Sequence, residues 1–458
     1  MSKGRKIFDA LGEADGQMVR EAAETRLRRP HRTVYRVAAA AACLALALGI
    51  FAAVKNGGAS GVMGALAEVA LPQAYAFDDY ESRRAVWEQN PLDEAFYEQV
   101  REFSYRTASA ALMAQDGNSN YSPLSLYYAL TTAALAARGE TQAELLDLLG
   151  ATDADTLTEN CGRLYRRLYK VNDIGALRLA TSLWMDDDVE FREQFVREAA
   201  ERLYAYSFRE SLSDPDTAEK MADWVSEMTG GLIEPDMELG GEQIMAILNT
   251  IYFRDEWINR FSEDSTAEDT FYLAVGGEVR CDFMNATYGS AGFQWGENFV
   301  RAQLGMKNRG SMVFVLPDEG TDVRELLASP EALREAFEGG EQSWGEVVWQ
   351  IPKFDFGAET DAGEVLRTLG VERMFGYDAD FSGAVDGVAY ISGVGQQTRI
   401  SIDERGVEAA AFTRIDYAGA APPNGRAEMI LNRPFLYGIT AENGTLLFVG
   451  VCADPTAK

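Results

Sequence analysis

Histidine is almost missing from this 458-residue chain, since the only one is His31. The residues after it therefore have no imidazole, which excludes a Ser-His-Asp or Cys-His catalytic arrangement and the usual His-bearing zinc sites there. Neither a glycine-rich phosphate loop with its lysine nor a Cys-x-x-Cys pair occurs. The sequence thus predicts no enzyme, no metal site and no cofactor.

Cysteine is scarce, and the four that occur are isolated. Cys43 lies in an apolar run, which leaves Cys161, Cys281 and Cys452, an odd number that makes no disulfide framework. We expect buried free thiols instead.

Basic residues are also in deficit, with 42 Lys and Arg against 72 Asp and Glu and a formal charge of -30. A nucleic-acid partner is therefore not expected, because phosphate contacts need clustered Lys and Arg. An acidic surface can attract basic partners, but solubility outside the cell is the favoured interpretation.

The N-terminus differs from the rest, because residues 1–36 are basic and an uncharged apolar run, Val37–Val54, follows them. Its 18 residues would span about 27 Å as a helix, enough to cross a bilayer core. The arginines before the run place the N-terminus in the cytoplasm and the long C-terminal part outside.

The sequence therefore predicts four segments: a cytoplasmic tail (1–36), a transmembrane signal-anchor (37–54), an extracellular tether (55–90) and a folded domain (91–458). Two alternatives stay open. A cleaved, secreted form would need a site such as Ala65–Ala67, which lies far beyond the run, and a lipid on Cys43 would lie inside it.

Two periodicities occur in the predicted domain. Apolar residues repeat at helical spacing at Phe96, Val100, Phe103 and Ala108, whereas Met312–Leu316 and Val347–Ile351 are short apolar runs typical of buried strands. Helices early and strands late, without regular alternation, predict an α+β fold and not a doubly wound one.

The segment Ser401–Tyr417 alternates strictly from Val407 onward, with Ala409, Ala411 and Thr413 on one face of an extended chain. The following Ala418–Gly425 contains small residues and two prolines, which is loop chemistry without a hairpin turn. A strand-competent segment that leads into a loop could add to a sheet.

This segment resembles the reactive-centre hinge of the serpin family, whose pattern is Glu-x-Gly-x-Glu-Ala-Ala-Ala. The residues that match it, or continue its inward face, are Glu404, Gly406, Val407, Glu408, Ala409, Ala410, Ala411 and Thr413. Further blocks follow in the family's order: Asn120–Ser125 with Arg138–Thr141, Leu183–Met185, Asn249–Trp257, Met312–Pro317, Ile351–Phe354, Leu369–Val371, Asn432–Leu436 and Leu447–Val451.

The resemblance implies a serpin fold, with helices around three β-sheets and an exposed reactive-centre loop. It also implies suicide inhibition of serine proteases: the loop is cut, and its hinge inserts into the central sheet before the acyl-enzyme is hydrolysed. The family's spacing from Glu404 places the reactive bond at Ala420–Ala421. The alternative is a non-inhibitory relative whose loop is only a substrate.

Small residues at this bond suit elastase-like or subtilisin-like proteases. We expect the protein to be a monomer on a bacterial surface. A sheet-opening cluster is implied at Ser122, Asn249, Gln396 and Trp257. The family commonly has histidine where this chain has Gln396, and glutamine can both donate and accept hydrogen bonds.

Overall fold

The computed structural model describes residues 64–457, apart from 236, 238, 240–244 and 408–424. They belong to one compact unit, Ala59–Lys458. The predicted cytoplasmic tail and the signal-anchor at 37–54 lie outside the described residues. Among the described helices, none is long and apolar enough to span a membrane.

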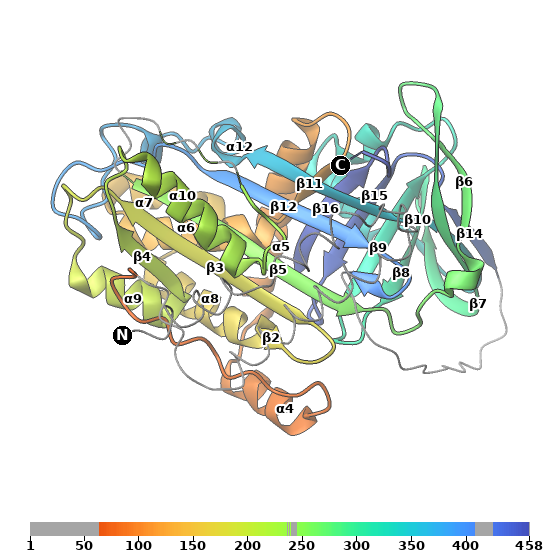
Figure 1. Cartoon of the computed structure of the whole chain (residues 1–458), viewed down its shortest axis with the longest axis horizontal. Coiled ribbons are helices and arrows are strands. Elements are labelled where there is room, and N and C mark those ends of the chain that lie inside the picture. The colour runs from red at the N-terminus through yellow and green to blue at the C-terminus, as the bar shows by residue number, and fades with distance from the viewer. Residues whose placement is uncertain (1–63, 236, 238, 240–244, 408–424, 458) are drawn as a thin grey trace, which may run out of the picture. The chain divides into compact units, whose positions relative to one another are not determined.

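Nine α-helices occur in the described part of the chain, and seven of them precede β5 in the sequence (Figure 1). Their bounds are α4 (Tyr80–Gln89), α5 (Glu94–Met113), α6 (Pro123–Ala136), α7 (Gly139–Leu149), α8 (Ala154–Leu168), α9 (Glu193–Leu203), α10 (Pro215–Met228), α11 (Pro330–Glu338) and α12 (Ala362–Thr368). Three short 3-10 turns are η1 (Glu263–Ser265), η2 (Val323–Leu327) and η3 (Arg373–Phe375).

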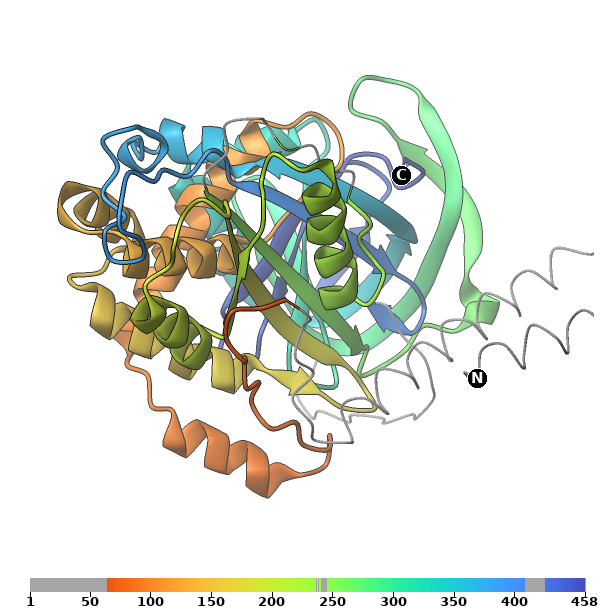
Figure 2. The same ribbon diagram turned by 60° about the vertical axis from the view of Figure 1, so that its left-hand side comes forward.

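The central sheet has the strand order β11-β12-β13-β5-β3-β2, and β4 also pairs with β3. Its strands are β2 (Lys170–Val171), β3 (Ala176–Met185), β4 (Ala205–Arg209), β5 (Met245–Glu256), β11 (Phe354–Asp361), β12 (Gly395–Ile402) and β13 (Gly406–Val407). Figures 1 and 2 show α10 lying across one face of this sheet.

A second, nine-stranded sheet has the order β1-β16-β15-β9-β8-β7-β10-β14, with β6 on β7. Its strands are β1 (Ser119–Tyr121), β6 (Ala267–Tyr272), β7 (Glu278–Trp295), β8 (Phe299–Gly305), β9 (Ser311–Pro317), β10 (Glu341–Pro352), β14 (Arg426–Ile430), β15 (Phe435–Thr440) and β16 (Leu446–Cys452). Two of the three expected sheets are joined here, because the 18-residue β7 pairs with both β8 and β10.

The main core lies around α6, in which all 14 residues are buried. Ser122 caps this helix by accepting a hydrogen bond from the Ser125 N–H, and Pro123 follows at the first helical position, where a missing N–H costs nothing. The predicted helix around Phe96 is α5, and the two predicted buried strands fall within β9 and β10.

The cysteines follow the expectation in part. Cys161 and Cys452 are buried free thiols, whereas Cys281 on β7 is only half-buried.

The boundary predicted at residue 91 is too late. The Leu66 N–H donates to the Ser207 carbonyl at 2.7 Å, and Val69 is buried. The guanidinium of Arg167 lies 4.4 Å from the ring centroid of Trp87 in α4 and donates to its carbonyl. Residues 64–90 of the predicted tether therefore pack on the domain, through contacts that no local sequence pattern signals.

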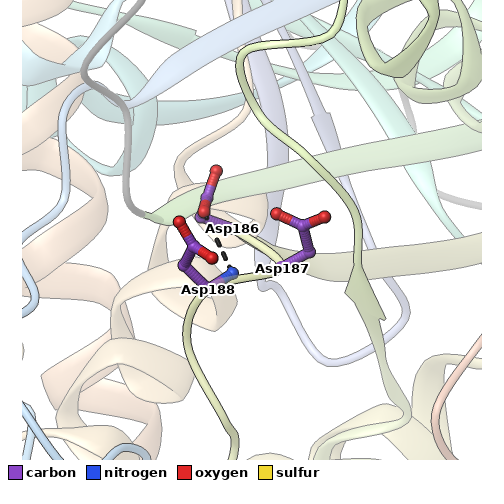
Figure 3. Close-up of side chains that lie close together, drawn as sticks. All are labelled: Asp186, Asp187 and Asp188. Atoms are coloured by element: carbon purple, nitrogen blue, oxygen red, sulfur yellow. Dashed lines mark hydrogen bonds between the residues drawn. The ribbon is translucent and has the colours of Figure 1, made fainter.

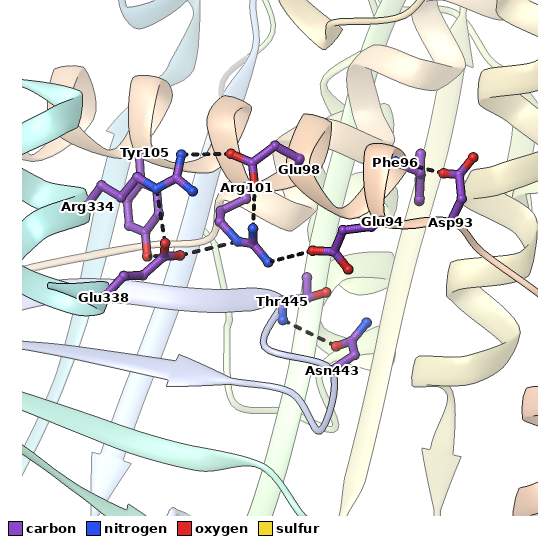
Figure 4. Close-up of polar contacts among 10 residues, drawn as sticks. All are labelled: Asp93, Glu94, Phe96, Glu98, Arg101, Tyr105, Arg334, Glu338, Asn443 and Thr445. Atoms are coloured by element: carbon purple, nitrogen blue, oxygen red, sulfur yellow. Dashed lines mark hydrogen bonds and ion pairs between the residues drawn. The ribbon is translucent and has the colours of Figure 1, made fainter. Parts of the chain in front are cut away.

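A network of ion pairs connects α5 to α11 (Figure 4). Arg101 lies 3.3 Å from Glu338 and also pairs with Glu98, while Arg334 contacts the same two carboxylates at 3.0 and 2.7 Å. The hydrogen bond from Arg334 is the main reason that the pKa of Glu98 lies below its usual value. Each ion pair is partly exposed and alone contributes little to the stability of the fold. Because both arginines share the same two carboxylates, the network fixes the contact between α5 and α11.

Candidate functional site

The central sheet is incomplete between β5 and β12. These two strands run parallel, and at one end Met245 of β5 forms a single bridge with Ile391, which precedes β12. At the other end the two-residue strand β13 lies antiparallel between them, with Val407 opposite Ile402 of β12 and Asp255 of β5. In the described part of the chain, no ladder pairs β5 directly with β12.

A pocket lies next to β13, in line with it along this gap. It is lined by Thr229, Leu232, Ile233, Ile251, Phe253, Arg399, Ile400, Val407, Ile439 and Phe448. Ile439 and Phe448 belong to the second sheet, whereas Leu232 and Ile233 follow α10 on the opposite face. The pocket therefore has walls from both sides of the central sheet, as an unfilled strand position would.

Gly406 and Val407 of the hinge lie in this gap. The Val407 side chain points inward, as the alternating pattern predicts. Val407 is 4% exposed and faces the core. A Cβ on Gly406 would lie 2.2 Å from the Asp255 carbonyl oxygen and 2.7 Å from the Glu256 Cα. Only glycine fits so close to the neighbouring backbone, which gives a physical reason for the glycine in the hinge pattern.

Glu404 anchors the start of the hinge. Its carboxylate accepts hydrogen bonds from Lys353 Nζ at 3.0 and 3.1 Å and from Thr266 Oγ1 at 2.8 Å. Burial alone would raise the pKa of Glu404, but the hydrogen bonds from Thr266 and Lys353 outweigh it, so the pKa is lowered. The carboxylate is thus held in its charged form where the hinge leaves β12.

The turn before β13 is tied to Trp257, the residue after β5. The indole N–H of Trp257 donates to the Asp403 carbonyl at 2.9 Å, and its backbone N–H donates to the Arg405 carbonyl at 3.0 Å. Asp403 Oδ1 accepts from the backbone N–H groups of Arg405 and Gly406. These bonds fix the direction in which the chain enters the gap.

Gln396 and Ser122 are hydrogen-bonded to each other beside the central sheet. Gln396 Oε1 accepts from the Ser122 N–H at 2.7 Å, and Gln396 Nε2 donates to the Ser122 carbonyl at 2.9 Å. Glutamine thus satisfies both backbone groups at the start of α6. Asn249 lies beside them, bonded to Ser125 and, at 2.5 Å, to Thr181 on β3.

Trp257 is not a member of this cluster, which corrects the sequence-based grouping. It follows the last residue of β5, near β13, whereas Asn249 lies within that strand. No local sequence pattern predicts a role for Lys353 or Thr266. Lys353 lies in the segment Ile351–Phe354 that resembles the family, but its pairing with Glu404, 51 residues away, is decided by the tertiary fold.

The rest of the predicted hinge, Glu408, Ala409, Ala410, Ala411 and Thr413, lies outside the described residues. So does the predicted reactive bond, Ala420–Ala421.

Asp186, Asp187 and Asp188 form an acidic group whose carboxylates could reach a common ion (Figure 3). Asp186 already accepts from the backbone N–H groups of Asp188 and Leu212, each at 3.1 Å. Arg209 donates to the Asp187 carbonyl. These bonds account for the turn, and an exposed acidic group is not by itself a metal site.

Comparison with known proteins identifies relatives over most of this chain. Serpin-Z7 from Hordeum vulgare is 27% identical over 78% of this chain and 95% of its own length. Serine proteinase inhibitor A3K from Cavia porcellus is 28% identical over 76% and 86%.

Among solved structures, the thermophilic serpin tengpin in its native state matches with a TM-score of 0.72, at 27% identity over 80% of this chain and 95% of that one. In its latent state the same serpin matches with a TM-score of 0.66 and 26% identity, over 79% and 98%. The model of the family described as Serpin (serine protease inhibitor) matches residues 98–455, so this chain belongs to the serpin family.

Proposed function

We propose that this protein inhibits serine proteases by trapping them as acyl-enzymes, with its hinge inserting as a new strand between β5 and β12. The observation that carries this proposal is the position of β13. Gly406 and Val407 of the hinge already lie in the gap, with Val407 inward, and the pocket lined by Ile251, Phe253 and Ile400 continues along the same line.

The register of β13 predicts where the following hinge residues would insert. Counting on in steps of two gives these inward positions: Ala409 between Phe253 and Ile400, Ala411 between Ile251 and Thr398, and Thr413 between Asn249 and Gln396. The two alanines would meet apolar side chains or a threonine, and the threonine would meet the polar cluster. Size and polarity thus match at each step, which supports insertion.

Insertion would also supply the free energy that distorts the protease. Each inserted residue would gain ladder hydrogen bonds to two neighbours that run antiparallel to it, and small side chains would fill the pocket. One cut in the loop should therefore raise the melting temperature of the protein. A passive serpin-fold protein, whose loop is only a substrate, would show no such rise.

The proposed targets are elastase-like or subtilisin-like proteases. Alanine before the reactive bond at Ala420–Ala421 suits a shallow or permissive primary pocket and offers no charge to the deep acidic pocket of trypsin-like enzymes. We further propose that the apolar run Val37–Val54 anchors the domain on the outer face of a cell membrane, where it would meet foreign proteases.

The decisive experiment mixes the purified chain with subtilisin or pancreatic elastase and separates the products on a denaturing gel. We expect a covalent complex, and a released C-terminal peptide that begins at Ala421 or within two residues of it. Complete loop cleavage without a complex would instead support the non-inhibitory alternative. A peptide that begins elsewhere would show that the reactive bond is misplaced.

A further inference from the structure

Two exposed tryptophans lie where the chain returns from the reactive loop. Trp344 on β10 is 46% exposed and Trp295 at the end of β7 is 43% exposed, and they are the only tryptophans among the large exposed apolar side chains of the described residues. Glu341 of β10 pairs with Trp295, and Trp344 pairs with Gly292. Exposed tryptophan is unusual on a free surface and is enriched in binding hot spots.

Trp344 lies against the neighbouring strand β7. Its indole N–H donates to Ser290 Oγ at 2.7 Å, so its polar group is already satisfied and its ring surface remains for a partner. A Cβ on Gly292 would lie 3.3–3.4 Å from the ring, so the ring lies close across that strand. A fixed aromatic side chain loses little conformational entropy when it is buried by a partner.

The loop returns to the sheet directly beside Trp344. The Glu346 N–H donates to the Gly425 carbonyl at 3.0 Å, and β14 begins at the next residue, pairing with β10. A Cβ on Gly345 would lie 1.9 Å from the Gly425 carbonyl oxygen, so glycine is needed there for the two chains to approach. The C-terminal end of the loop is therefore fixed next to the tryptophan.

The length of the chain brings a bound protease over this surface. Four Cα–Cα steps separate Ala421 from Gly425, at most about 15 Å, and Gly425 lies opposite Gly345, one residue or about 3 Å along β10 from Trp344. A protease domain of about 230 residues has a radius of gyration of about 17 Å and is therefore about 45 Å across. A protease that holds the proposed bond in its active site would thus cover Trp344.

We propose that Trp344 is a docking anchor for the target protease, outside the reactive loop. The partner surface would be the rim of the protease active site on the side that binds the residues after the cut. This inference rests on the proposed function, but it concerns the encounter with protease and not loop insertion. Trp344 would determine how fast particular proteases are captured.

The test measures binding of a subtilisin whose catalytic serine is replaced by alanine, since this enzyme can dock but cannot cut. We expect the Kd to rise about 10-fold for Trp344→Ala and at most about 3-fold for Trp344→Phe, which keeps an aromatic ring. Tyr377→Ala is the matched control. Tyr377 is 76% exposed and follows η3, which lies away from β10 and β14 (Figure 1). The Kd of the Tyr377→Ala variant for the inactive subtilisin should therefore equal that of the parent.

Equal Kd values for the parent and Trp344→Ala would overturn the docking anchor while leaving protease trapping intact. If the parent neither binds this subtilisin nor traps active subtilisin, both proposals fail. Should Trp344→Ala not fold, hydroxyl-radical oxidation of the parent provides the second measurement. Oxidation of Trp344 should fall when the inactive subtilisin is bound, and unchanged oxidation would contradict the proposal.

Discussion

Under the proposed trapping mechanism, replacing Ala409 with glutamate should leave cleavage of the loop intact and abolish most of the trapping of protease. The register of β13 predicts that the Ala409 side chain inserts between Phe253 and Ile400, toward a pocket that is otherwise lined mainly by apolar groups. In the described part of that pocket, the only charged lining residue is Arg399, which is paired with Asp355. A glutamate there would have no partner.

The magnitude follows from the cost of neutralising the new carboxylate. With an ordinary pKa of about 4.3, taking up a proton at pH 7.5 costs about 4 kcal/mol. If half of this cost is present in the transition state of insertion, insertion slows about 30-fold. Hydrolysis of the acyl-enzyme does not depend on the inserting side chain. The number of inhibitor molecules cut without trapping, for each protease trapped, should therefore rise about 30-fold over the parent.

The assay titrates active subtilisin with inhibitor and counts the molecules cut per enzyme lost. Ala410→Glu is the matched control, because the same register places Ala410 on the outer face beside Arg399, whose side chain is 42% exposed. This variant should trap protease like the parent. The rise in melting temperature after loop cleavage should also return for Ala409→Glu near pH 5, where the neutralisation cost falls to about 1 kcal/mol. Trapping by Ala409→Glu at the parent's efficiency would refute the inward assignment.

Three further predictions concern the hinge anchor, the polar cluster and the membrane. Lys353→Ala leaves the Glu404 carboxylate without its cation, so the free energy of unfolding measured by thermal denaturation should fall by about 1–3 kcal/mol. Because the pKa of Glu404 is lowered, this stabilisation is present above about pH 4.3 and is lost as the pH falls further, so the parent and the variant should converge in acid. Gln396→Ala leaves the Ser122 N–H buried without its partner and should lower stability by about 1–3 kcal/mol, whereas an unchanged melting temperature would show that water or another group replaces the amide. The full-length chain should partition with membranes through Val37–Val54 and resist carbonate extraction, and a mature N-terminus after this run in untreated cells would instead indicate cleavage and secretion.

The sequence was informative where a short-range pattern carries the structure. Side chains alternate every two residues along a strand, so the orientation of Val407 could be predicted from its neighbours alone, and it lies buried as expected. The same holds for the strands β9 and β10 and for the helix α5, whose apolar residues recur at helical spacing. The resemblance to the serpin family likewise depends on short runs of consecutive residues, which can be recognised without the tertiary structure.

Contacts between distant residues were decided only by the tertiary structure. The pairing of Glu404 with Lys353, the position of Trp257 beside the hinge and the packing of residues 64–90 on the domain have no local signal. The incomplete pairing of β5 and β12 is likewise invisible in sequence, because each strand alone looks like any other. Such features arise when chain segments far apart meet in the fold, where burial and hydrogen-bond geometry select among many partners that the sequence would allow.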